Sequence, residues 1–132
     1  MAFLLYSVAD DSVLPLEYLP VAAITPKAGM ALYESSGNLT TASASNIATH
    51  ICMVEKSSAC TAGDLIPVVR IQKDQIWEST LAATTTLAVG ATTDVASGGL
   101  TVAAAGTAGS NLEIVYEEAL ASGSKVRVRF IK

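Results

Sequence analysis

Apolar and polar residues alternate most regularly at the carboxyl end of the chain, where residues 111–132 read NLEIVYEEALASGSKVRVRFIK. The two alternating runs flank the loop ASG, whose glycine suits the left-handed backbone that short hairpin loops need. We therefore expect a β-hairpin in which Ile114 lies opposite Phe130 and Glu117 lies opposite Arg127. Apolar pairs would then cover one face of the hairpin, and a charge pair would lie on the other.

Shorter runs of apolar and β-branched residues between turn-like sequences predict further strands. The turns include Gly37–Asn38 and Ala62–Gly63–Asp64, and Pro67 marks its own run as an edge strand or a bulge. No run has the periodicity of a long amphipathic helix. The pattern favours an all-β fold, a small β-barrel or sandwich-like domain, with expected strands at Met30–Glu34, Leu39–Ala42, Ile47–Lys56, Leu65–Ile71 and Gln75–Leu81.

The stretch Leu81–Ser110 consists almost wholly of Ala, Thr, Val, Leu, Gly and Ser, and its one charged residue is Asp94. Local alternation of Thr, Leu and Val around its glycines favours short strands joined by glycine turns. The alternative is a flexible surface loop, because the run AAAGTAG is also typical of linkers. Under either interpretation the stretch supplies almost no reactive side chain.

Residues 1–27 are expected to form an extended N-terminal arm ahead of a β-rich domain over residues 28–132. Prolines within the arm break any helix and favour extended or turn geometry. The apolar side chains of the arm either pack back on the same chain or reach a neighbour. Trp77, the one tryptophan, belongs either to a partner interface or to the core. The candidate contact residues are Leu4, Leu5, Tyr6, Leu14, Leu16, Tyr18 and Trp77.

The composition suits one folded domain that lacks large core side chains. The chain has 132 residues, of which 51% are hydrophobic but only 5% are aromatic, and much of the apolar content is alanine. Small side chains gain less from burial, since the gain is about 25 cal/mol per Å² of apolar surface. Burial against neighbouring subunits would compensate, which is a first indication of an assembly.

The charge distribution disfavours two classes of partner. The formal net charge is −4 and no basic cluster occurs outside the last expected strand, which argues against nucleic-acid binding. No apolar run approaches the roughly 18 residues of a membrane helix. The start, MAFLLYSVADDS, lacks the positive region of a secretory leader, so we expect synthesis in the cytosol.

The residues capable of chemistry form no recognisable catalytic or metal-binding pattern. His50 is the one histidine, no serine lies in a G-x-S-x-G sequence, and the glycines match no phosphate loop. The adjacent carboxylates of Asp10 and Asp11 lack the further spaced ligands of a calcium site. Cys52 and Cys60 match no zinc spacing and are expected to be free thiols, although a local disulfide across a hairpin tip is the alternative. We expect no enzyme activity, no cofactor and no metal.

The order of these segments resembles a known family. A proline-containing arm leads into a domain that begins AGMALYESSGNLTTAS, continues with ICMVEKSSACTAGDLIPVVRI and an Ala/Thr/Gly-rich stretch, and closes with the hairpin. Over roughly residues 20–132, this is similar to the small β-rich head-decoration, or cement, proteins of tailed bacteriophages and prophages. The likeness rests on the style and order of the elements.

The resemblance implies a structural protein of the virion, made in the bacterial cytoplasm and bound to the outside of an expanded capsid. Its partner would be the major capsid protein, whose neighbouring subunits it would clamp, commonly as a homotrimer. The arm would pair with a strand edge of the capsid. The alternative is another phage virion β module, such as a tail-tube, head-fibre, receptor-binding or carbohydrate-binding protein.

Overall fold

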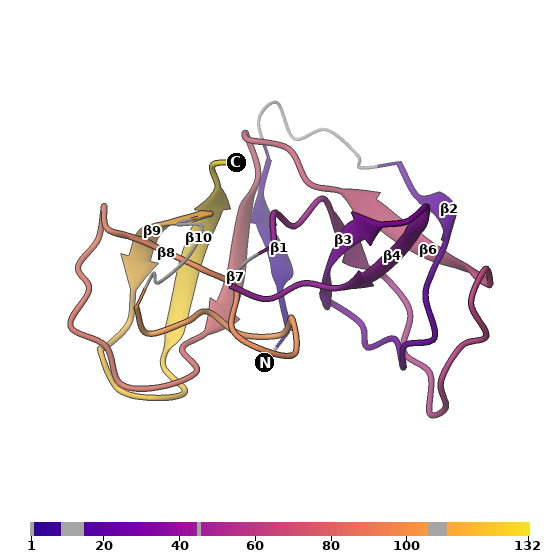
Figure 1. Cartoon of the computed structure of the whole chain (residues 1–132). Coiled ribbons are helices and arrows are strands. Elements are labelled where there is room, and N and C mark those ends of the chain that lie inside the picture. The colour runs from indigo at the N-terminus through magenta and orange to yellow at the C-terminus, as the bar shows by residue number, and fades with distance from the viewer. Residues whose placement is uncertain (1, 9–14, 45, 106–110) are drawn as a thin grey trace.

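A computed structural model of the chain describes residues 2–8, 15–44, 46–105 and 111–132. The described residues form an all-β fold without helices, in which two five-stranded antiparallel sheets lie side by side (Figure 1). This confirms the predicted fold class. The first sheet, sheet A, has the strand order β1 (Leu4–Ser7), β7 (Ile76–Thr80), β10 (Lys125–Phe130), β9 (Leu112–Glu117) and β8 (Thr92–Thr93).

The second sheet, sheet B, is rolled without closing into a complete barrel. A parallel bridge joins Val21, just after β2, to Leu39 in β4, and the amide of Ala22 donates to the carbonyl of Leu39 at 2.8 Å. These contacts bring the two outer strands of the sheet together. Sheet B has the strand order β2 (Glu17–Pro20), β6 (Leu65–Arg70), β5 (His50–Cys52), β3 (Ala31–Ser35) and β4 (Asn38–Thr41).

Alternate residues of sheet B supply two separate hydrophobic cores. Ile51 lies opposite both Ala31 and Val69 in neighbouring strands, and this row packs against sheet A. The intervening residues, among them Leu32 and Cys52, face the inside of the roll. Successive side chains of a strand point to opposite faces, so the central strands are buried on both sides. The core between the sheets includes Phe3, Trp77, Leu112, Ile114, Val126, Val128 and Phe130, and the core inside the roll includes Val21, Leu39, Cys60, Ile66 and Val68.

Each described part of the N-terminal arm contributes the outer strand of one of these sheets. β1 pairs antiparallel with β7, with Leu5 opposite Trp77, and a bulge at Tyr6 precedes Ser7. β2 pairs antiparallel with β6. Phe3 is buried in the core, and its amide donates to the carbonyl of Gly29 at 2.9 Å. Of the two alternatives for the arm, these segments therefore pack back on their own chain.

The C-terminal hairpin forms, but its predicted register was wrong. Phe130 lies opposite Leu112 and Val128 lies opposite Ile114, a shift of two residues from the predicted pairing. The cause is a longer connection between the strands and an irregularity in β9 opposite Arg127 and Val128. A shift of an even number keeps each side chain on its face. Leu112, Ile114, Val128 and Phe130 therefore still enter the core. Beyond the irregularity the alternation fails, because Tyr116 lies opposite Arg127 and is 40% exposed.

The predicted ion pair between Glu117 and Arg127 is also wrong. Arg127 instead donates from Nε to the Glu78 carboxylate in β7 at 3.0 Å. Arg129 pairs with Glu113, which lies directly opposite it in β9. Charged residues on the outer face therefore do pair across strands. Their partners could not be predicted, because the predicted register was wrong and the order of the strands was unknown.

The predicted long strand Ile47–Lys56 is wrong in length, since only His50–Cys52 is a strand. The turn between β3 and β4 lies one residue earlier than expected, at Ser36–Gly37, with φ of 53° and 85°. Two positive φ values in a two-residue loop are typical of the type I′ turn, whose twist matches the twist of the flanking strands.

The Ala/Thr-rich stretch is ordered over its described part, residues 81–105, but it contains little regular strand. It holds the two-residue strand β8 and the bridges from Val102 to Leu81 and to Val95. Gly90, Gly98 and Gly99 have positive φ, as glycine turns require. Val95 and Val102 are completely buried in the core between the sheets, so residues 81–105 are not a loose surface loop. Residues 106–109 of the linker-like run AAAGTAG lie outside the described residues.

Candidate contact surface

The exposed apolar residues of the arm lie in the outer strand β1 and in or just before the outer strand β2. Five of the predicted contact residues are between 40% and 63% exposed in β1 and at the start of sheet B, namely Leu4, Leu5, Tyr6, Leu16 and Tyr18. Leu14 lies outside the described residues. Exposed apolar side chains are ordinary when they are scattered singly, whereas a contiguous group indicates an interaction site.

Trp77 is a core residue, and its assignment as a contact residue is corrected. Its side chain is 2% exposed, and its indole Nε1–H donates to Oε1 of Gln75 at 3.2 Å. β7 is the second strand of sheet A, flanked by β1 and β10, and its alternate residues face the core. Of the two predicted alternatives for this tryptophan, the core position is the observed one.

An apolar groove with a volume of about 520 Å³ lies beside these exposed residues. All its lining side chains are apolar apart from the thiol of Cys52, and they come from both sheets. Leu5 in β1 and Met53, which follows β5, both line it. The groove therefore lies along the junction of the sheets, lined among others by Leu4, Leu5, Leu16, Ala28, Met53 and Val69.

β1 and β2 are each the outermost strand of a sheet. An outer strand presents backbone N–H and C=O groups that can pair with another extended segment. β1 thus combines a main-chain edge with apolar side chains at the groove. Such a combination can bind an extended peptide by strand addition, because the edge supplies hydrogen bonds and the groove accepts side chains.

Arg127 in β10 contacts two aromatic rings, one in the edge strand β1 and one in β9. The guanidinium carbon of Arg127 lies 3.8 Å from the ring centroid of Tyr6 and 4.4 Å from that of Tyr116. These distances are within the range of cation–π attraction. The arrangement links the first strand of the chain to β10 and β9, and so positions the edge at which the groove lies.

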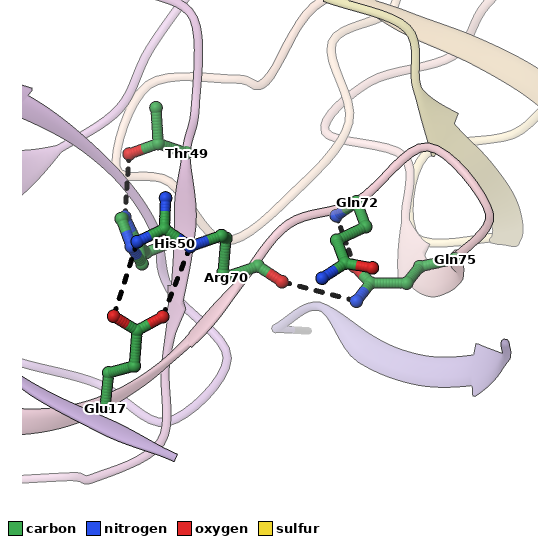
Figure 2. A network of polar contacts seen from close by, with 6 residues as sticks. All are labelled: Glu17, Thr49, His50, Arg70, Gln72 and Gln75. Atoms are coloured by element: carbon green, nitrogen blue, oxygen red, sulfur yellow. Dashed lines mark hydrogen bonds and ion pairs between the residues drawn. The ribbon is translucent and has the colours of Figure 1, made fainter. Parts of the chain in front are cut away.

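A second cluster of functional groups lies in sheet B, away from the groove (Figure 2). Glu17 accepts from Nε and Nη2 of Arg70 at 3.2 and 3.3 Å, which joins β2 to β6. His50 in β5 lies opposite Arg70 in β6, and the Nδ1 atom of His50 is 2.8 Å from Oγ1 of Thr49. Burial, and secondarily the positive charge of Arg70, lowers the pKa of His50 below its usual value. The imidazole is therefore neutral at pH 7.

Gln75 connects this cluster to the core. Its Nε2 donates to the carbonyl of Arg70 at 3.2 Å, and its Oε1 accepts from the amide of Gln72 (Figure 2). The same Oε1 also accepts from the indole of Trp77. A completely buried amide needs such partners, since an unpaired one would be costly. The turn between β6 and β7 is thereby fixed to the indole that fills the core between the sheets.

The two cysteines are buried free thiols inside the roll of sheet B. Burial raises the pKa of Cys52, whose Sγ–H donates to the carbonyl of Val54 at 3.1 Å. A raised pKa keeps the thiol protonated and unreactive. Among the described residues, no group of three or more His, Cys, Asp or Glu side chains is placed to hold a metal ion. The same residues contain no helix long and apolar enough to cross a membrane.

Sequence reasoning identified the exposed residues of the arm but missed the far wall of the groove and the Glu17–Arg70–His50 cluster. Ala28 and Met53 carry no signal of their own, because only the pairing of strands brings them beside β1. His50 was noted as the one histidine, and its alternation with Cys52 was the available signal that it faces the interior. Comparisons with known protein families, with curated proteins and with solved structures found no match.

Proposed function

We propose that this chain is a structural virion protein that decorates and stabilises the outer surface of a phage capsid by clamping neighbouring major capsid subunits. The observation that carries the proposal is the apolar groove beside the outer strand β1, which the exposed apolar residues Leu4, Leu5, Leu16 and Met53 help to line. The order of elements that resembles head-decoration proteins names the class of partner.

The geometry supports a contact function over a catalytic one. The groove is lined by apolar side chains, whereas a catalytic pocket needs convergent titratable groups. An extended segment of a capsid subunit would pair with the edge of β1 and place apolar side chains into the groove. Repetition on a symmetric lattice would add many such contacts, so each one can be weak. On the capsid the protein would act as a homotrimer.

Binding to expanded capsids of the phage or prophage that encodes the chain tests the proposal. Saturable binding and a higher disruption temperature of the capsid are expected. The double variant Leu5→Ser/Leu16→Ser should bind at least about tenfold more weakly, because it removes two apolar groups from the groove, each worth about 1.5–3 kcal/mol when buried.

Leu120→Ser is the matched control, because Leu120 is a similarly exposed leucine, at 47%, in the loop between β9 and β10. It should bind as the unaltered protein does. Absence of capsid binding, or equal weakening by the control, would overturn the proposal. Electron microscopy of labelled particles distinguishes the alternative, because a tail-tube, fibre or receptor-binding module would appear elsewhere than on the capsid faces.

A further inference from the structure

The face of sheet B that points away from the inside of the roll is only partly covered by sheet A. Tyr18 in β2 lies directly opposite Pro67 in β6, and the amide of Met53, which follows β5, donates to the carbonyl of Pro67 at 3.0 Å. These three residues therefore form a row across neighbouring strands. Ile66 and Val68, the neighbours of Pro67, belong to the core inside the roll. Because side chains alternate along a strand, the row lies on the opposite, outward face.

The positions that adjoin this row on the outward face are also apolar. Leu16 directly precedes β2 and Leu65 begins β6, and alternation places both on the same face as the row. Further along the same face, Ile51 and Val69 are buried in the core between the sheets, so sheet A covers that part. The uncovered part, here named the β2–β6 face, has four large side chains that are between 47% and 63% exposed, and it consists of Leu16, Tyr18, Met53, Leu65 and Pro67.

The β2–β6 face contains no charged side chain, although the chain has a formal net charge of −4. The neighbouring ion pair between Glu17 and Arg70 starts from strand positions that point to the inside of the roll. Net charge of one sign keeps copies of a protein apart. Two copies can therefore approach through this uncharged face without opposing like charges, whereas the charged surfaces of an acidic chain resist such an approach.

The exposed area of this face is close to what a contact between two copies needs. Because a large side chain presents about 150–250 Å² when it is fully free, four that are about half exposed offer on the order of 400 Å². A standard interface buries about 800 Å² on each partner, of which about 57% is apolar. The β2–β6 face thus supplies the apolar part of one side of such an interface.

The adjoining edge of β2 is poorly suited to binding by strand addition. Pro20 ends the strand and has no N–H to donate. Directly after it, the bridge from Val21 to Leu39 occupies the backbone of that edge. A partner at this position is therefore bound through side chains on the face of the sheet, in contrast to the edge of β1.

We propose that the β2–β6 face binds the same face of a second copy of this chain, which gives a two-fold dimer of the free protein. A patch that meets itself forms a closed contact, and two-fold dimers are the commonest homo-oligomers. Facing sheets pack about 10 Å apart, so Tyr18 and Leu65 of one copy would interdigitate with the row of the other. Tyr18, Leu65 and Pro67 do not line the apolar groove, so the contact is separate from the capsid binding proposed above. The proposed homotrimer concerns only the capsid-bound protein.

Sedimentation of the purified full-length protein over a range of concentrations, without capsids, tests the proposal. We expect a reversible equilibrium between monomer and dimer. In NMR spectra recorded on dilution, the amide signals of residues 16–19 and 65–66 should shift with the dissociation, while those of β9 (Leu112–Glu117) should not. A protein that is monomeric up to about 1 mM, or one that forms trimers, would overturn the proposal.

Leu65→Ser should weaken dimerisation at least about tenfold, because a two-fold contact loses the apolar side chain twice. Leu65 is 61% exposed, so the variant should fold, which circular dichroism checks. Tyr18→Ala provides a second variant of the same face. Leu120→Ser is the matched control, because Leu120 is an exposed leucine in the loop between β9 and β10.

The control should dimerise as the unaltered protein does, and equal weakening by Leu65→Ser and Leu120→Ser would contradict the proposal. If the protein alone stayed monomeric but Leu65→Ser weakened its binding to capsids, the face would belong to a capsid contact and not to a second copy. Because the sedimentation experiment contains no capsids, a failure of the proposed capsid function leaves its result unaffected.

Discussion

The guanidinium carbon of Arg127 lies 3.8 Å from the ring centroid of Tyr6, which joins the C-terminal hairpin to the first strand of the chain. The same group lies 4.4 Å from the ring of Tyr116 and donates to Glu78, so one side chain contacts three other strands of sheet A. β1 is a four-residue outer strand with exposed side chains, and its own ladder is short. Arg127 is therefore a principal side-chain link that holds this edge in place.

Replacing Arg127 with methionine should loosen β1 more than it destabilises the whole fold. The variant keeps much of the apolar stem but loses two cation–π contacts, each worth about 0.5–1 kcal/mol at exposed sites, and the ion pair with Glu78, worth up to about 1 kcal/mol. We expect a loss of about 1–3 kcal/mol in unfolding free energy and faster amide exchange in residues 4–7. Hydrogen exchange measured by NMR, with chemical denaturation, provides both values.

Arg129→Met is the control for this prediction. Arg129 is in the same strand and pairs with Glu113, but no contact of its guanidinium with an aromatic ring is found among the described residues. It should leave exchange in β1 unchanged. If both variants speed amide exchange in β1 equally, β1 is held by the general positive charge of β10 and not by the aromatic contacts of Arg127.

Two glycines with similar backbone angles should respond differently to alanine. Gly99 has φ of 74°, and a Cβ there would lie 2.8 Å from the carbonyl oxygen of Ala31. Gly37 has φ of 85°, and a Cβ there would meet only open space. Left-handed backbone alone costs alanine about 1–2 kcal/mol, and a forced shift of packed backbone adds about 1–3 kcal/mol.

Gly99→Ala should therefore lower the unfolding free energy by about 2 kcal/mol more than Gly37→Ala. Chemical denaturation of the two variants measures the difference directly. The comparison tests whether the Ala/Thr-rich segment packs tightly on β3, since a loose segment would move aside. Equal losses in the two variants would show that Gly99 has no close neighbour in solution.

The hairpin and Gly99 show what could be read from the sequence. Alternation predicted the buried face of β10 and of the first part of β9, because side-chain direction in a regular strand follows a period of two. It could not give the register or the irregularity in β9, beyond which Tyr116 is exposed opposite Arg127. Gly99 was predicted to lie in a turn, but its approach to Ala31 depends on a contact between segments far apart in the chain.

The residues of the candidate contact surface were likewise only partly predictable from the sequence. Leu5 and Leu16 could be selected because apolar residues in a proline-rich arm have no local partner. Met53 could not be selected, because the strand order that brings it to the groove is a property of the whole fold. Trp77 was equally compatible with core and interface, since burial of a single aromatic residue is decided by its neighbours.

The stability of the protein should fall as the pH drops below the ordinary His50 value of 6.5. The pKa of His50 is lowered in the folded state by burial and by Arg70, so the unfolded chain binds this proton more readily. Unfolding free energy therefore decreases with falling pH, from about 6.5 down to the folded-state pKa of His50. Denaturation at a series of pH values from 7.5 to about 5 measures the slope, above the usual range of the carboxylates.

His50→Gln should flatten that slope, because glutamine does not titrate. The comparison uses slopes and not absolute stabilities, since the substitution also changes packing inside the roll. A slope that is unchanged in the variant would show that another group binds the proton.

Removing Trp77 should destabilise the fold far more than removing an exposed residue of the contact surface. Trp77→Ala deletes a 2%-exposed indole and its hydrogen bond to Gln75, and such core truncations cost about 3–5 kcal/mol. Tyr18→Ala, at a position that is 63% exposed, should change the unfolding free energy by at most about 0.5 kcal/mol.

Capsid binding adds a second measurement to this comparison. Under the proposed function, Tyr18→Ala should weaken binding while its stability is retained, because Tyr18 is an exposed aromatic residue of the outer strand β2. Trp77→Ala should lose binding only to the extent that it unfolds, which denaturation at the binding temperature determines. If Trp77→Ala stayed folded and yet bound capsids more weakly, Trp77 would contribute to the interface directly, which its observed position in the core contradicts.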